Sequence, residues 1–100
     1  MFMPIHDSLV SYHVQISSSY AKLDVGSSFF KGLENVYILE NDGMYKYLTG
    51  AESSYENIKL LLKEVQEKFQ DAFVIAIKNG KVISLQQAFS ESGLKNHRIN

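Results

Sequence analysis

The side chains best suited to recognise a ligand lie on one side of a predicted strand, residues 9–17. His13, Gln15 and Ser17 alternate with apolar residues, and a period of two puts the polar and apolar side chains on opposite faces of a strand. The amide of Gln15 both donates and accepts hydrogen bonds, which suits sugar hydroxyls. For His13, contact with a ligand and plain exposure to solvent are equal alternatives.

A second set of such residues lies on the strand predicted over residues 44–49. We expect Tyr45 and Tyr47 to face the helices as core residues, so that Lys46 and Leu48 face the other way. Amide, hydroxyl, ammonium and apolar groups would then share one face of a sheet, a combination that suits an extended polar ligand such as a glycan. An ordinary solvated sheet surface is the alternative.

The segment after the first strand adds two further candidates. Residues 17–28 are polar and form a long connection for so small a domain. Ser18 follows the predicted strand directly and joins Ser17 as a candidate. Tyr20 would either fold over a ligand as a stacking platform or make an unrelated apolar contact.

The acidic residues form no recognisable catalytic constellation. Glu40 and Glu52 would meet as a carboxylate pair near the ends of a hairpin, but we favour separate, solvated surface acids. No Gly-x-Ser-x-Gly elbow frames any serine, so nucleophilic hydrolysis has no support. We therefore expect a protein that is not an enzyme.

Metal ions, nucleotide cofactors and nucleic acid are also not indicated. His6, His13 and His97 lack the short spacing of metal ligands, and the glycines are isolated rather than grouped in a phosphate-binding loop. The net charge of -1 and the pI of about 6.3 provide no positive field for phosphate backbones. Residues 45–50 also lack the basic and aromatic signature of RNA-binding domains.

The chain of 100 residues, 45% apolar and 21% charged, is of a size for one domain, which we place at residues 11–89. Residues 1–10 are expected to form a flexible arm and residues 90–100 a flexible tail. The first residues lack a charged region followed by a long apolar run, so we expect neither a signal peptide nor insertion into a membrane. The absence of cysteine excludes disulfides.

The periodicities predict an α+β domain of ferredoxin-like βαββαβ type, with a four-stranded antiparallel sheet and its helices on one face. Ser53-x-x-Glu56 and Ser84-x-x-Gln87 fit capping boxes at the starts of two helices, and Asn79-Gly80 is a strong hairpin signal. The expected strands are residues 9–17, 36–40, 44–49 and 72–77, with a short additional strand at 81–84. The expected helices are residues 29–33, capped by Ser27 or Ser28, then 54–69 and 85–89.

Several of these segments resemble the SPOR (sporulation-related repeat) domain family. Tyr12-His13-Val14-Gln15-Ile16 is similar to the opening strand of that family. Tyr45-Lys46-Tyr47-Leu48-Thr49-Gly50, the capped helix over 53–69 and Asp71-Ala72-Phe73-Val74 resemble its third strand, helix and closing strand. The likeness extends over residues 11–85, and the chain is similar to the SPOR-like modules of Bacteroidetes-type N-acetylmuramoyl-L-alanine amidases.

The resemblance implies a function in the bacterial periplasm or cell envelope. SPOR domains bind peptidoglycan, prefer glycan strands stripped of stem peptides, and are often attached to cell-wall amidases or division proteins. Gln15 matches the glutamine of the family's first strand, and Lys46 matches its basic residue on the third. Ser17-Ser18-Ser19 and Ala51-Glu52 depart from the Gly-Ser-Phe and Pro-Phe that are usual there. A protein-interaction or self-association module, acting through the sheet face or an edge strand, is the alternative function.

Overall fold

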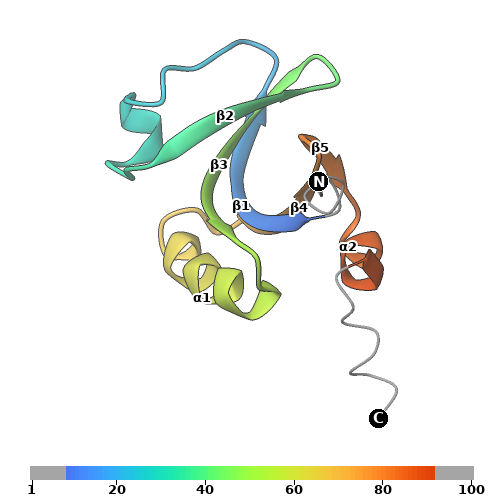
Figure 1. Ribbon diagram of the computed structural model, residues 1–100. Coiled ribbons are helices and arrows are strands. Elements are labelled where there is room, and N and C mark those ends of the chain that lie inside the picture. Colours follow the sequence, from blue (N-terminus) through green and yellow to red (C-terminus); the bar gives the residue numbers. More distant parts are fainter. Residues whose placement is uncertain (1–8, 92–100) are drawn as a thin grey trace.

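The computed structural model describes residues 9–91, and their strands form one curled antiparallel sheet (Figure 1). The strands are β1 (Val10–Ser19), β2 (Val36–Asn41), β3 (Met44–Glu52), β4 (Phe73–Lys78) and β5 (Lys81–Ile83). Their order across the sheet is β2-β3-β1-β4-β5, so β1 is the central strand. The α+β class is as predicted.

The sheet has five strands, and the prediction of a four-stranded sheet is therefore wrong. Asn79 and Gly80 both have positive φ, 54° and 78°, as a two-residue hairpin turn requires. This turn lays β5 against β4 with Lys78 opposite Lys81. The short strand expected at 81–84 thus becomes an edge of the sheet.

Two α-helices and one short 3-10 helix complete the fold: α1 (Tyr55–Gln66), α2 (Leu85–Glu91) and η2 (Ser28–Phe30). The Oγ of Ser54, not of Ser53, caps α1 by accepting a bond from the Asn57 backbone N–H. The Oγ of Ser84 accepts from Gln87 N–H, as its capping box predicted. The helix expected at 29–33 is reduced to the single turn η2, whose N-cap residue Ser27 makes no side-chain cap bond.

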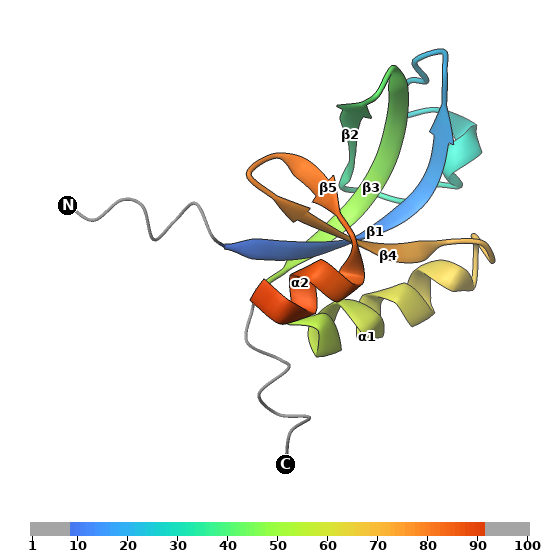
Figure 2. The ribbon, with the colours of Figure 1, turned by 90° about the vertical axis from the view of Figure 1, so that its right-hand side faces the viewer.

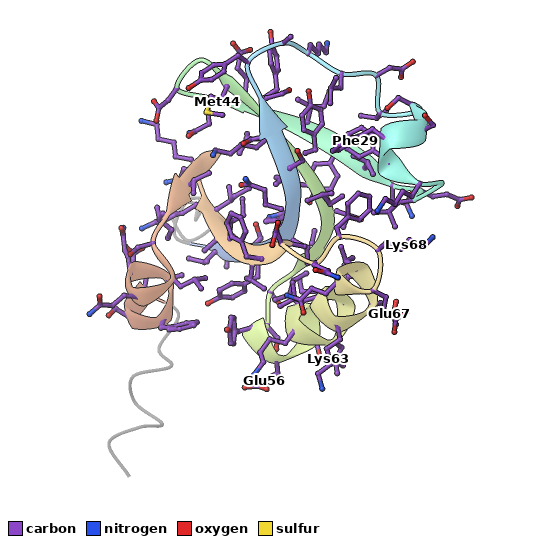
Figure 3. All side chains as sticks on the ribbon, turned by 180° about the vertical axis from the view of Figure 1, so that it is seen from behind. Phe29, Met44, Glu56, Lys63, Glu67 and Lys68 are labelled. Carbon is purple, nitrogen blue, oxygen red and sulfur yellow. The ribbon has the colours of Figure 1, made fainter. Side chains whose placement is uncertain are left out.

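Both α-helices lie on the same side of the sheet, as Figure 2 shows from the side. Tyr12 of β1 contacts the rings of Tyr55 in α1 and Phe89 in α2, with centroid separations of 5.8 and 6.2 Å. The charged side chains of Glu56 and Lys63 in α1, and of Glu67 directly after it, point away from the sheet (Figure 3). The helices therefore bury one face of the sheet and leave their polar faces to solvent.

The core lies between this face and the helices. Tyr47 is a core residue as expected: it is fully buried, and its ring centroid is 5.2 Å from that of Phe30 in η2. Tyr45 faces the same side, where it is partly buried against the core. The hydroxyl of Tyr47 accepts a bond from the Leu23 backbone N–H, which ties the long β1–β2 connection to the sheet. The residues 1–8 and 92–100, where most of the expected arm and tail fall, lie outside the described part of the chain.

Two irregularities change which side chains share a face. Between Gln15 and Ser17 an extra residue in β1 shifts its register with β3, and between Thr49 and Glu52 an extra residue in β3 shifts it back. Gly50 lies in the second irregularity with φ 79°, a conformation that favours glycine. Because α1 packs directly over Gly50, a Cβ there would overlap Leu61 Cδ2 and lie 3.1 Å from Ile58 Cδ1.

We predict that Gly50→Ala destabilises the domain more than Gly43→Ala. Both residues have positive φ, 79° and 78°, so each alanine costs about 1–2 kcal/mol of backbone strain. Only the alanine at 50 also overpacks the contact with α1, which adds about 1–3 kcal/mol, because a Cβ at 43 meets nothing within 4 Å. Urea unfolding of the two variants measures this difference, and equal losses would contradict the role of Gly50 in helix packing.

Candidate functional site

The candidate site is the face of the sheet opposite to the helices, which we call the uncovered face. Directly paired residues of antiparallel strands point to the same side, so the register assigns its members. His13 is opposite Ile75, Gln15 is opposite both Leu48 and Phe73, Tyr37 is opposite Leu48, and Ser18 and Leu39 are opposite Lys46. The uncovered face thus contains His13, Gln15, Ser18, Tyr37, Leu39, Lys46, Leu48, Phe73 and Ile75.

His13 lies at the centre of a hydrogen-bonded cluster on this face. Its Nδ1 is 2.8 Å from the Gly50 carbonyl oxygen, and its Nε2 is 2.7 Å from Ser11 Oγ. The hydroxyl of Tyr37 also donates to the Gly50 carbonyl and lies within hydrogen-bond distance of His13 Nδ1. A carbonyl is only an acceptor, so Nδ1 carries the proton and Nε2 accepts from the Ser11 hydroxyl. These hydrogen bonds all form with the imidazole of His13 in its neutral state.

Burial shifts the ionisation of both rings in this cluster. Loss of solvent lowers the pKa of His13 below its ordinary value near 6.5, and the bond to the Gly50 carbonyl offsets part of that effect. Burial raises the pKa of the Tyr37 hydroxyl. Both groups are therefore kept neutral near pH 7. They serve to connect β1, β2 and β3 through the Gly50 carbonyl.

The structure corrects the expectations for His13, Gln15 and Leu48. Only 7% of His13 and 6% of Gln15 are exposed, and Leu48 is fully buried, although all three lie on the uncovered face. The Tyr37 ring packs edge-on against His13, with a centroid separation of 5.9 Å. His13 is thus neither a solvated side chain nor a free ligand contact. These three residues form the floor of the site.

The structure places Ser17, Ser18 and Tyr20, three predicted site residues, in different surroundings. The irregularity after Gln15 turns Ser17 toward the side of Tyr47, which is the helix side, and leaves Ser18 beside Lys46. Strict alternation had placed Ser17 next to Gln15, and that assignment is wrong. Tyr20 lies just beyond the end of β1 and is 79% exposed. Lys46 is half-buried on the uncovered face, as its strand position predicted.

Two aromatic residues of this face were not among the predicted site residues. Phe73 is 50% exposed beside Gln15, and Tyr37 is partly exposed beside Leu48. The predicted strand 72–77 is wholly apolar in sequence, so hydrophobicity does not distinguish its two faces. Its alternation carried a usable signal, because the small residues Ala72 and Ala76 lie on the helix side and leave Phe73 on the other.

Other predicted groupings do not form. Glu40 lies opposite Tyr45 next to the β2–β3 turn, whereas Glu52 lies opposite Tyr12 at the far end of β3, so the carboxylate pair is absent. Within residues 9–91, no three histidine, aspartate or glutamate side chains are grouped so that they could hold a metal ion. None of the helices there is long and apolar enough to cross a membrane.

Comparisons with known proteins give no match: no family model, no curated protein and no solved structure is similar to this chain.

We predict that the His13 cluster makes stability depend on pH. The pKa of His13 is lower in the folded than in the unfolded chain, so the unfolded chain takes up the proton first as the pH falls. The contribution of neutral His13 to the free energy of unfolding is complete above about pH 6.5. Below that pH the free energy of unfolding falls, with a slope of at most about 1.4 kcal/mol per pH unit.

Urea unfolding between pH 8 and pH 5 measures this slope. His13→Asn is the matched variant, because its amide N–H can replace Nδ1–H as the donor to Gly50 without titrating. The difference in unfolding free energy between the two proteins should change with pH only below about 6.5. A difference that stays constant across the range would contradict a neutral, buried His13.

Proposed function

We propose that this domain binds peptidoglycan glycan strands across the uncovered face without catalysing a reaction. In the cell envelope, it would bring a cell-wall amidase or a division protein to the wall. The observation that supports this most is the separation of the two faces: both α-helices lie on one side, and Phe73, Tyr37, Lys46 and Ser18 line the other. The sequence resemblance to SPOR domains supplies the ligand class.

We also propose that the fold is a ferredoxin-like βαββαβ domain of the SPOR type. The order β2-β3-β1-β4 within the sheet is that of such a domain, with β5 added at one edge. The first helix would correspond to the single turn of η2 (Ser28–Phe30), and the second to α1. Because η2 is only one turn long, it is the side chains of Phe30 and Leu23 that pack over β2 and β3 on the helix side.

Different side chains of the uncovered face would make different kinds of contact with an extended polar polymer. Phe73 and Tyr37 offer partly exposed rings on opposite sides of β1, and aromatic rings provide a flat apolar surface with little loss of conformational freedom on binding. The Lys46 ammonium group donates hydrogen bonds, and the Ser18 hydroxyl both donates and accepts them. The buried floor of His13, Gln15 and Leu48 keeps the strands that carry these groups in register.

We predict that Phe73→Ala weakens binding to insoluble peptidoglycan sacculi about 10-fold, which corresponds to about 1.4 kcal/mol. Leu60→Ala is the matched control: Leu60 is 64% exposed, but it lies on α1 and so on the opposite side of the molecule. Lys46→Ala should also weaken binding, since it removes a charged donor from the same face. Co-sedimentation with sacculi measures the bound fraction, and thermal unfolding checks that each variant is folded.

Pre-treatment of the sacculi with an amidase distinguishes a glycan from a peptide ligand. Removal of stem peptides should raise the bound fraction if glycan strands are recognised. Sedimentation that is unchanged in Phe73→Ala and Lys46→Ala, or absent in the unmodified protein, would refute the proposal and favour a protein-interaction module.

A further inference from the structure

The two edges of the sheet differ in how well they are protected from pairing with another strand. At one edge, β5 has only three residues and begins with Lys81, and short length and lysine both oppose pairing. At the other edge, β2 has six residues, VYILEN, and pairs with β3 in a register without interruption. It contains no proline or lysine, and its single charge is Glu40. The edge at β2 is thus open to strand addition.

The turn at the end of β2 determines which backbone groups face outward. Asp42 and Gly43 have φ of 55° and 78°, the pattern of a two-residue type I′ turn. In such a hairpin, the residues that flank the turn, Asn41 and Met44, form a hydrogen-bonded pair. Alternation along the ladder then directs the N–H and C=O groups of Val36, Ile38 and Glu40 away from β3.

We propose that β2 pairs with β2 of a second copy of this chain, antiparallel and about a two-fold axis at Ile38. In this register Ile38 is opposite Ile38 of the other copy, Val36 is opposite Glu40, and Tyr37 is opposite Leu39. In this register, every residue of β2 whose backbone groups point outward pairs with such a residue of the other copy. If one copy slid by two residues, one of these residues would be left unpaired on each copy. The interaction goes beyond glycan binding and does not depend on it.

The chemistry of β2 favours a second copy over an unrelated strand. The two Glu40 carboxylates lie at opposite ends of the paired region, about 14 Å apart along the strands, so no like charges face each other. Tyr37 and Leu39 form an aromatic–aliphatic cross-strand pair on the uncovered face, a combination that stabilises sheets. A two-fold axis perpendicular to the sheet also joins the uncovered faces of both copies into one continuous surface.

Blocking one backbone donor tests the proposal. Analytical ultracentrifugation of the full chain should show a dimer that increases with protein concentration. Glu40→Pro removes an outward N–H and should leave a monomer, whereas Glu40→Ala retains that N–H and should still dimerise. A monomer at every concentration for the unmodified protein would overturn the proposal, and so would a dimer that persists in a folded Glu40→Pro variant.

A cross-linking experiment tests the register without relying on that proline. The chain contains no cysteine, so a single introduced one can pair only with its copy. Ile38→Cys should form a disulfide-linked dimer under mild oxidation, because paired residues have Cα atoms about 5.5 Å apart. Glu40→Cys should not, at about 14 Å. Equal cross-linking of the two variants, or cross-linking at position 40 alone, would overturn the proposed register.

Discussion

The backbone at Gly50 is the constraint on which both sides of the sheet depend. Its positive φ allows the extra residue in β3, and the missing side chain lets Leu61 and Ile58 of α1 approach the sheet closely. On the opposite side, the same residue's carbonyl accepts bonds from His13 and Tyr37. One residue therefore takes part both in the packing of α1 on the sheet and in the hydrogen-bonded cluster of the uncovered face.

Two polar side chains on the uncovered face, those of His13 and Gln15, have a structural role. His13 and Gln15 are the most polar residues of β1, yet they are buried and support the face from within. The groups that a ligand would meet are Phe73, Tyr37, Lys46 and Ser18, which come from all four longer strands. The proposed binding surface extends over four strands, and the neutral His13 cluster connects three of them, β1, β2 and β3, beneath it.

The edges of the sheet add a second level of organisation. Lys78 and Glu91 form an ion pair that fastens α2 to β4, and the short β5 closes that end of the sheet. The end at β2 has no such closure within residues 9–91. If two copies join there, the proposed glycan-binding surfaces become one longer surface. A polymer could then engage both copies at once and gain avidity without any new contact.

Local sequence signals determined the elements of this protein. The alternation in β1, the Asn79-Gly80 turn and the Ser84 cap act over a few residues, and they predicted the bounds of β1, β4, β5 and α2 within two positions. The predicted ends of β3 and α1 each differ from the structure by three residues. The burial of His13, Gln15 and Leu48, the turn of Ser17 toward the helix side and the exposure of Phe73 were decided by tertiary structure. These properties depend on an irregular register between β1 and β3 and on the curl of the sheet. Such features arise only when strands that are distant in sequence pair with each other. They therefore cannot be predicted from the alternation of residues within one strand.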